Sequence, residues 1–303
     1  MTSISCCVVL SGEQQSRLWQ GAGDWDIQFQ DPAEASDCPV VFGNPEPPVV
    51  TGNHALRWMQ LESVGFGEYA DLDLTRPDGM VQITNLAGFF ADPVAETALA
   101  CILALGRGID RLAVLQQRAE WVGDPLREDL RLLKGASVLL FGYGAINRRV
   151  AELLSPFGCR IDFLASGWTA DELDTALAEA DILIATAPDT QRTRGLFDQA
   201  RLGRMKMGAI FCNFGRGSLV DEAVLANALQ AGQLGGAVID VTEDEPLPVD
   251  HAFWRCPNTI VTQHSGGGTA DELDRKIDVF LANLARYRKN EPLEGLVDFA
   301  RGY

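Results

Sequence analysis

Three polar residues in the last third of the chain carry the side chains needed for hydride-transfer chemistry: Arg216, Glu245 and His264. A planar guanidinium pairs bidentately with a carboxylate. An imidazole exchanges a proton near neutral pH, and a carboxylate on its second nitrogen orients the ring and stabilises its charged form. With a bound dinucleotide, these groups are the parts needed to reduce the carbonyl of a 2-keto acid.

Each of the three residues also has a simpler interpretation. Arg216 stands between two glycines after an apolar run, where it would otherwise be a surface arginine in a turn. His264 follows another apolar run and precedes three glycines, and it would otherwise be a polar loop residue. Glu245 lies beside a proline in an acidic loop, in which Glu243 is a rival for the same role.

A glycine-rich turn lies upstream, after the apolar run Ser137–Phe141 and before a helical pattern. In this setting Gly142 permits the tight turn, and Gly144 lets the backbone approach a pyrophosphate at the helix N-terminus. Asn147 stands where a third glycine is expected, so we expect looser packing of the helix on the strand. The context favours dinucleotide binding, although two glycines alone are often only a turn.

The end of the next predicted strand carries no residue that selects between the two nicotinamide dinucleotides. A carboxylate there would bind the ribose hydroxyls of NAD, but the sequence has Ala165, Ser166 and Gly167. No nearby arginine clearly selects the 2′-phosphate of NADP. We therefore expect that NADP is accepted, with at most modest discrimination against NAD.

Composition restricts the remaining classes of function. The chain has 303 residues, 47% of them hydrophobic, which suffices for two domains. A formal net charge of -17 repels nucleic acid and anionic membranes, so we expect neither as a partner. The seven cysteines contain no CxxC pair and predict reduced, buried thiols in a cytoplasmic protein. The three histidines are not clustered, so no metal site is expected.

Short apolar runs between turn residues predict two parallel α/β units. In the first unit we expect strands at Ile4–Leu10, Pro39–Phe42, Trp58–Ser63 and Val81–Thr84. In the second unit we expect strands at Ser137–Phe141, Arg160–Leu164, Asp181–Ala185, Ala209–Asn213, Gly236–Val241 and Thr259–Thr262. Six strands with intervening helices predict a doubly wound sheet.

Helical patterns separate and flank these strands. They are expected at Val94–Ile109, Ile146–Phe157, Glu222–Gln230 and Asp271–Lys289, the last returning to the first unit. Asp92 and Pro93 suit the N-cap and first position of the Val94–Ile109 helix. Its most apolar stretch, Val94–Leu105, is too short to span a bilayer. The charged stretch Leu115–Arg131 contains Trp121 and is expected to form an arm or a connecting helix.

Several longer motifs resemble the D-isomer-specific 2-hydroxyacid dehydrogenase family. Residues 91–96 resemble the entry to the family's inter-domain helix. Residues 187–196 resemble its cofactor loop, with Asp189 in place of the usual leucine, and residues 213–221 and 237–248 follow its signatures. Gln263 replaces the usual proline before the histidine. The tail, residues 297–303, resembles the ending of bacterial glyoxylate/hydroxypyruvate reductases of the A type.

The resemblance implies an α/β fold with two doubly wound parallel-sheet domains. Residues 89–269 would form a Rossmann-type dinucleotide-binding domain, and residues 1–88 plus 270–303 a smaller, flavodoxin-like substrate domain. A charged arm that joins two nucleotide domains implies a homodimer.

The same resemblance assigns roles to residues of the site. Arg216 would bind the substrate carboxylate, His264 would act as acid and base, and Glu245 would orient it. Substrate would also meet the backbone N–H groups of a second loop, formed by Val64, Gly65 and Phe66. The residues expected to bind NAD(P) are Gly142, Gly144, Ala145, Ile146, Ala165, Ser166, Ala187, Pro188, Thr193, Asn213, Phe214, Asp240 and Gly266.

The expected reaction is reduction of a small 2-keto acid such as glyoxylate or hydroxypyruvate. Two other functions stay open. One is a cofactor-sensing regulatory protein on the same fold, against which the intact Arg/Glu/His set argues. The other is a pseudoenzyme with impaired dinucleotide binding, which Asn147 and Ala165 motivate.

Overall fold

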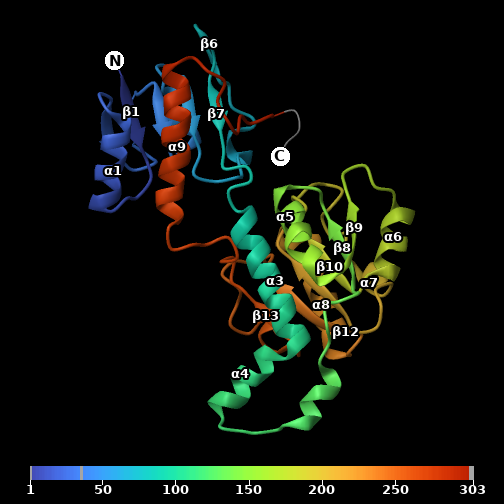
Figure 1. Cartoon of the computed structure of the whole chain (residues 1–303). Helices are drawn as coiled ribbons and strands as arrows, with labels where there is room; N and C mark the ends of the chain where they lie inside the picture. The colour runs from blue at the N-terminus through green and yellow to red at the C-terminus, as the bar shows by residue number, and fades with distance from the viewer. Residues whose placement is uncertain (1, 35–36, 300–303) are drawn as a thin grey trace. The chain divides into compact units, whose positions relative to one another are not determined.

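The computed structural model describes residues 2–34 and 37–299, and they form two compact units (Figure 1). The first unit comprises Met1–Phe89 and Thr269–Tyr303, and the second comprises Phe90–Gly268. Each is built on one parallel sheet with helices, so the predicted α/β class with two parallel-sheet domains is confirmed. The last four residues of the tail motif, 300–303, lie outside the described residues.

The first unit has a five-stranded sheet in the order β2-β1-β3-β4-β7. Its strands are β1 (Ser3–Cys6), β2 (Asp26–Phe29), β3 (Val40–Phe42), β4 (Trp58–Gln60) and β7 (Gln82–Thr84). Counted along the chain, the second strand lies outside the first, which is the order of flavodoxin-like folds. Strand β2 is absent from the prediction because this edge strand alternates polar and apolar residues. A separate hairpin is formed by β5 (Thr75–Arg76) and β6 (Gly79–Met80).

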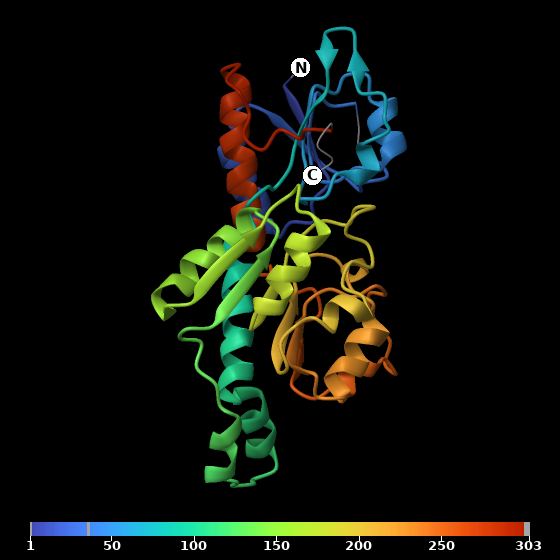
Figure 2. The same cartoon turned by 90° about the vertical axis from the view of Figure 1, so that its right-hand side faces the viewer.

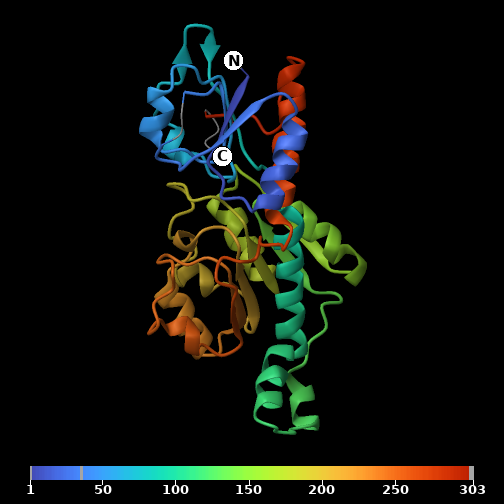
Figure 3. The ribbon, with the colours of Figure 1, turned by 90° about the vertical axis from the view of Figure 1, so that its left-hand side faces the viewer.

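Helices cover both faces of this first sheet. Helices α1 (Gly12–Ala22) and α9 (Glu272–Arg288) lie side by side on one face (Figure 3). Helix α2 (Pro47–Gly52) packs on the other face. Phe280 of α9 stacks on Phe42 of β3, with ring centroids 4.5 Å apart. The C-terminal helix therefore returns to the first unit, as the sequence predicts.

The second unit has a six-stranded parallel sheet in the order β13-β12-β11-β10-β8-β9. Its strands are β8 (Ser137–Phe141), β9 (Arg160–Leu164), β10 (Ile182–Ala185), β11 (Ala209–Asn213), β12 (Leu234–Ile239) and β13 (Thr259–Val261). All six predicted strands are present, and β12 begins and ends earlier than predicted. The strand order reverses between β8 and β10, where open α/β sheets bind ligands. No described strand lies outside β9, so β9 is the edge of this sheet.

Two hydrophobic clusters sandwich the second sheet and make it doubly wound. Helices α3 (Ala91–Arg107) and α5 (Ala145–Leu154) cover one face. Helices α6 (Ala170–Glu179) and α8 (Glu222–Gln230) cover the other. The short helix α7 (Gln199–Leu202) adjoins α8. Parallel strands buried on both faces are continuously apolar, which is why their bounds are legible in the sequence.

Helix α3 begins earlier than predicted. Phe90 is its N-cap, so Asp92 and Pro93 both lie inside the first turn, and the prediction of Asp92 as the cap is wrong. The Asp92 carboxylate instead accepts a hydrogen bond from Arg149 of α5 at 2.6 Å. An acid in the first turn is still favourable to the helix dipole.

The predicted arm is only partly helical. Helix α4 (Ile109–Gln117) begins before the arm and covers its first residues, and a 3₁₀ turn at Asp124–Asp129 lies near the end of the arm. Both elements project from the body of the second unit (Figure 2). No residue of α4 is buried, and Trp121 is 96% exposed. The arm therefore presents apolar side chains that the chain itself does not cover.

All seven cysteines are free, and six of them are buried, as predicted for thiols packed as small hydrophobes. Burial raises the pKa of Cys101 to about 11, so this thiol stays protonated at neutral pH. No helix in the described ranges is long and apolar enough to cross a membrane. Within the same ranges, no group of His, Cys, Asp and Glu side chains is arranged to hold a metal ion.

Candidate active site

The polar residues predicted for the second unit gather at the carboxyl edge of its sheet. Gly142 follows β8, Asn213 ends β11, Asp240 follows β12 and His264 follows β13. Because the strands are parallel, these ends meet at one edge. The structure thus brings together side chains that are far apart in the sequence.

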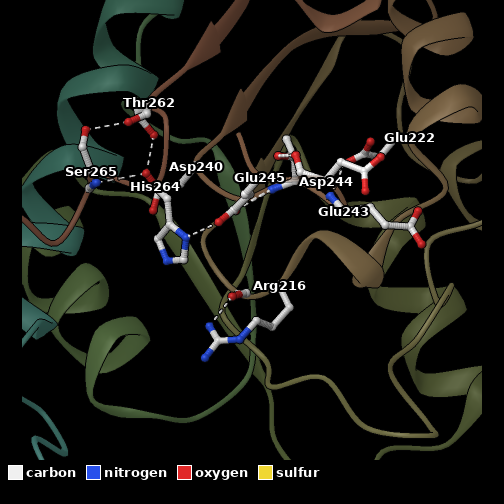
Figure 4. Close-up of polar contacts among 12 residues, drawn as sticks. Arg216, Glu222, Asp240, Glu243, Asp244, Glu245, Thr262, His264 and Ser265 are labelled. Carbon is white, nitrogen blue, oxygen red and sulfur yellow. Dashed lines mark hydrogen bonds and ion pairs between the residues drawn. The ribbon is translucent and has the colours of Figure 1, made fainter. Parts of the chain in front are cut away.

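His264 and Glu245 form a direct pair at this edge (Figure 4). Nδ1 of His264 lies 2.7 Å from Oε2 of Glu245, and the other carboxylate oxygen accepts the N–H of Thr242 at 3.0 Å. The partner of the histidine is therefore Glu245 and not its rival Glu243, whose backbone N–H donates to Glu222 at 2.8 Å. His264 is 55% exposed, and its Nε2 makes no hydrogen bond to a described residue, so it can meet a ligand.

The Glu245 carboxyl is held in its charged form. Partial burial works against ionisation, but the hydrogen bonds from His264 and Thr242 and the positive charge of Arg216 together lower its pKa below the usual range. A carboxylate at this position keeps the Nδ1 proton of His264 in place and stabilises the imidazolium.

The backbone of His264 is unusual, and Asp240 holds it in place. Gln263 and His264 have φ angles of 56° and 53°, in the left-handed region that side chains other than glycine rarely adopt. The Asp240 carbonyl accepts the His264 N–H at 2.6 Å, and Oδ1 accepts the Thr262 hydroxyl at 2.5 Å and the Gly266 N–H at 3.0 Å (Figure 4). Proline fixes φ near −65°, so this backbone excludes a proline at position 263.

Arg216 is positioned by the two glycines beside it. A Cβ at Gly215 would lie 2.5 Å from the carbonyl oxygen of Ala187, and one at Gly217 would lie 2.0 Å from the carbonyl carbon of Thr242. Only glycine therefore lets the loop wedge between the segments that follow β10 and β12. Buried Asn213 closes the turn: its Nδ2 donates to the Arg216 carbonyl at 2.9 Å, and its Oδ1 accepts the Gly215 N–H at 3.0 Å.

The Arg216 guanidinium itself is exposed and free for an anion. Its Nη1 donates to the Gly215 carbonyl at 2.7 Å, and it makes no ion pair with any residue that the structure describes. Figure 4 shows it near the His264–Glu245 pair. In a chain with a net charge of -17, such an unpaired cation is suited to attract a carboxylate.

The glycine turn after β8 fits a dinucleotide pyrophosphate. Gly142 has a φ of 108°, and a Cβ on Gly144 would meet nothing within 4 Å. Helix α5 has no side-chain N-cap, and the N–H groups of Ala145 and Ile146 at its positive end make no backbone or side-chain hydrogen bond among the described residues, so they are free to meet an anion. Helices α1, α6 and α8 are capped by the side chains of Ser11, Thr169 and Asp221, whereas α3 and α9 also lack a side-chain cap.

Asn147 corrects the expectation of looser packing at the third glycine position. Its side chain is completely buried, and Nδ2 donates to the carbonyls of Phe141 and Gly142 at 3.1 and 2.9 Å. The amide thus ties helix α5 to the end of β8 and fills the space that a glycine would leave.

The loop after β10 is ordered by Thr193, which is buried. Its hydroxyl donates to the Pro188 carbonyl at 2.6 Å and accepts the Thr190 N–H at 2.8 Å. Ala187 packs against the Arg216 loop, as described above. These residues hold two segments of the edge together, while their contact with a cofactor stays a prediction.

Four other predicted cofactor residues lie at the same edge. Ala165 and Ser166 are exposed after β9, and Phe214 is buried in the core under α3 and α5. Gly266 is pinned by Asp240 and approaches it so closely that a Cβ would lie 3.0 Å from Oδ1. Direct cofactor contacts of these residues also stay predictions.

The loop of Val64, Gly65 and Phe66 belongs to the first unit and follows β4. Its carbonyls are occupied: Asn85 Nδ2 donates to the Val64 carbonyl at 2.7 Å, and the Ser63 hydroxyl donates to that of Gly65 at 2.8 Å. The backbone N–H groups of Val64, Gly65 and Phe66 make no hydrogen bond to a described residue. The binding of a substrate anion by these N–H groups stays a prediction.

Sequence reasoning missed two features of the second unit. Glu222 holds the acidic loop through the Glu243 N–H, and its Oε2 lies 3.2 Å from Nε2 of His251, which is therefore structural. Arg192 lies over the ring of Trp168, beside the end of β9. Arg192 and Trp168 are 24 positions apart, and Glu222 is 21 positions from Glu243, so no local sequence pattern predicts either contact.

Comparison with known proteins agrees with this geometry. A model described as "D-isomer specific 2-hydroxyacid dehydrogenase, NAD binding domain" matches residues 99–266, more than half of the chain. The chain belongs to the D-isomer-specific 2-hydroxyacid dehydrogenase family. The resemblance seen in its motifs is thereby confirmed, and the second unit contains the family's NAD-binding domain.

Individual relatives of this dehydrogenase cover most of its length. A glyoxylate reductase from Thermofilum pendens is 30% identical over 80% of this chain and 75% of the relative. A glyoxylate/hydroxypyruvate reductase A from Serratia proteamaculans is 31% identical over 70% of this chain and 69% of the relative. A crystal structure of a family member from Aeromonas salmonicida has a TM-score of 0.81 at 27% identity, covering 98% of this chain and 99% of the other.

Proposed function

We propose that this dehydrogenase reduces a small 2-keto acid to the 2-hydroxy acid with NADH or NADPH. The observation that carries the proposal is the His264–Glu245 pair beside an unpaired Arg216 at the carboxyl edge of an NAD-binding sheet. A regulatory protein that only senses the cofactor has no use for an acid/base pair of this kind. A pseudoenzyme is disfavoured by Asn147, which supports the glycine turn rather than disturbing it.

In the proposed mechanism each residue has one task. Arg216 binds the substrate carboxylate and orients the adjacent carbonyl. The bound nicotinamide dinucleotide supplies hydride to the carbonyl carbon. His264 gives the proton on Nε2 to the oxygen that becomes the hydroxyl, and Glu245 stabilises the ring while it is charged. The free N–H groups after Val64 are a further predicted contact for the substrate.

Glyoxylate and hydroxypyruvate are the substrates to test first. Curated relatives with these names are about one-third identical, for example the reductase A from Serratia proteamaculans at 31%. Both molecules present a carboxylate next to a carbonyl, which suits one guanidinium beside one imidazole.

The proposal is tested by following oxidation of NADH and NADPH with glyoxylate, hydroxypyruvate and pyruvate. A thermal-shift measurement with each cofactor accompanies it, because a bound ligand raises the unfolding temperature. We expect turnover and a shift in Tm. A shift without turnover on any 2-keto acid would favour the cofactor sensor, and no shift with either cofactor would favour the pseudoenzyme.

Cofactor choice gives a first specific prediction. Ala165→Asp introduces a carboxylate at the end of β9, where it accepts from the ribose hydroxyls of NADH and repels a 2′-phosphate. The ratio of kcat/KM for NADH to that for NADPH should rise about tenfold, the scale of one charge interaction. Ala165→Asn, which adds a similar side chain without charge, is the control. An unchanged ratio in Ala165→Asp would mean that the ribose lies elsewhere.

Dimerisation is a second prediction. Trp121 and Val122 are exposed apolar residues of the arm, and Ile109, Leu112 and Val114 are exposed on the part of helix α4 that precedes it. A two-fold dimer would bury these side chains. Light scattering at micromolar concentration should give twice the mass of one 32.9 kDa chain. Trp121→Glu should shift the equilibrium toward monomer, whereas Trp19→Glu, a change at an exposed tryptophan of the first unit, should not. A wild-type monomer would contradict the prediction.

A further inference from the structure

Two arginines lie in the loop after β10, and they differ in their partners. Nη2 of Arg194 lies 2.5 Å from Oδ2 of Asp189, so the charge of Arg194 is neutralised within the loop. Arg192 makes no ion pair with any residue in the ranges 2–34 and 37–299. The loop therefore carries one free cation, and its position decides what that cation can bind.

Trp168 holds Arg192 against the turn that follows β9. The guanidinium carbon lies 4.6 Å from the centroid of the Trp168 ring, and Nη2 donates to the Trp168 carbonyl at 2.7 Å. The Trp168 ring meets Phe141, the last residue of β8, edge-on at 5.8 Å. These contacts fix Arg192 at the carboxyl edge of β8 and β9. Its Nε and Nη1 make no hydrogen bond to a described residue, so they can serve a ligand.

No carboxylate of the same turn competes for this cation. The turn from Ala165 to Thr169 contains no acid. Glu172, in the first turn of α6, is committed to the helix cap, where its Oε2 accepts the N–H and the hydroxyl of Thr169 at 2.7 and 3.0 Å. The hydrogen bond from the Thr169 backbone lowers the pKa of Glu172, as expected for a carboxylate engaged in its own cap.

In a doubly wound sheet, the end of the second strand is where the adenosine ribose of a dinucleotide lies. We propose that Arg192, stacked on Trp168, binds the 2′-phosphate of NADPH and makes this dehydrogenase prefer NADPH to NADH. The stack holds the guanidinium plane in place, so little freedom is lost when its N–H groups meet a phosphate. The inference rests on the proposed dinucleotide-dependent reduction, and it replaces the modest discrimination that the sequence predicts.

Binding measured by isothermal titration calorimetry on the full chain tests this assignment without relying on turnover. The ligands are NADP⁺ and NAD⁺, together with 2′-AMP and 5′-AMP as probes of the phosphate position. The variants are Arg192→Gln and Arg192→Lys, and Arg194→Gln is the matched control because its charge is already paired in the same loop. Thermal unfolding of each variant reports whether the loop remains folded.

For wild type we expect NADP⁺ to bind more tightly than NAD⁺. Arg192→Gln should raise the dissociation constants of NADP⁺ and 2′-AMP about tenfold to hundredfold, the scale of charge-assisted hydrogen bonds. NAD⁺ and 5′-AMP should change little. Arg192→Lys should recover part of the loss, because it keeps the charge without the fork. Arg194→Gln should leave the ratio of the two dissociation constants unchanged.

Four results would overturn the assignment. If Arg192→Gln weakens both dinucleotides equally, the arginine only joins two loops. If Arg192→Gln and Arg194→Gln lower NADP⁺ affinity to the same extent, the effect is one of general charge. If wild type binds NAD⁺ and NADP⁺ equally and Arg192→Gln changes neither, dinucleotide binding stands while this residue has no part in selection. A wild type that binds neither contradicts the proposed function as well.

Discussion

Replacing His264 by alanine should lower kcat for the best 2-keto acid by about 10²–10⁴-fold, the usual contribution of a general acid. The reason is that Nε2 is the free nitrogen of a ring whose Nδ1 is already held by Glu245 at 2.7 Å. The dissociation constants of NADH and NADPH should change little, because the glycine turn after β8 is untouched. Steady-state kinetics with a separate cofactor titration checks both parts.

The control for this variant is His54→Ala, which removes an exposed histidine of the first unit. His54→Ala should keep wild-type kcat. The left-handed backbone at His264 is stabilised from the Asp240 side, so alanine at this position should not unfold the protein, and circular dichroism verifies that. Near-normal turnover of folded His264→Ala would remove His264 from the mechanism.

Arg216→Lys should reduce kcat/KM for 2-keto acids about tenfold to hundredfold, the scale of the charge-assisted hydrogen bonds that a bidentate fork provides. A lysine keeps the charge, but its ammonium lacks the planar pair of parallel N–H groups that bind a carboxylate bidentately. The kcat/KM for simple aldehydes, which lack the carboxylate, should hardly change. The comparison is made with glyoxylate against a small aldehyde under the same cofactor concentration.

Arg194→Lys is the matched control, because Arg194 is a surface arginine of the same unit whose charge is paired with Asp189. It should leave both substrates unaffected. If Arg216→Lys lowers kcat/KM equally for the acid and the aldehyde, the guanidinium is not a carboxylate clamp. It would then act through the loop that Asn213 closes.

The strands of the second sheet that the sequence predicts best are those buried on both faces. Strands β8, β10 and β11 are buried on both faces, so they appear as continuous apolar runs, and β8 and β11 match the predicted bounds. The bounds of β9 also match the prediction, although this edge strand is only partly buried. Edge strand β2 is half-buried and was missed. The N-cap of helix α3 is Phe90, which has no side chain that can cap a helix. The start of this helix at Ala91 therefore leaves no signal in the sequence.

The candidate site shows the same division. Arg216, Glu245 and His264 were identified because glycines and a proline mark their loops. Their supports were not, because each depends on contacts between distant loops. Asn147 looks like a defect in a glycine motif until its amide is seen to bridge β8 and α5. No sequence motif singles out Arg192. Its proposed role depends on its contact with the Trp168 ring, which only the structure shows.

The position of β9 at the edge of the second sheet has a consequence for how the protein behaves in concentrated solution. An unpaired strand edge can recruit a strand from another molecule and start aggregation. Arg160 is the first residue of β9, and it forms ion pairs with Asp162 at 3.6 Å and with Glu179 at 3.1 Å. Solvated charges therefore line the open edge. These charges oppose edge-to-edge pairing, and their removal should lower solubility before it affects the chemistry at the other end of the strands.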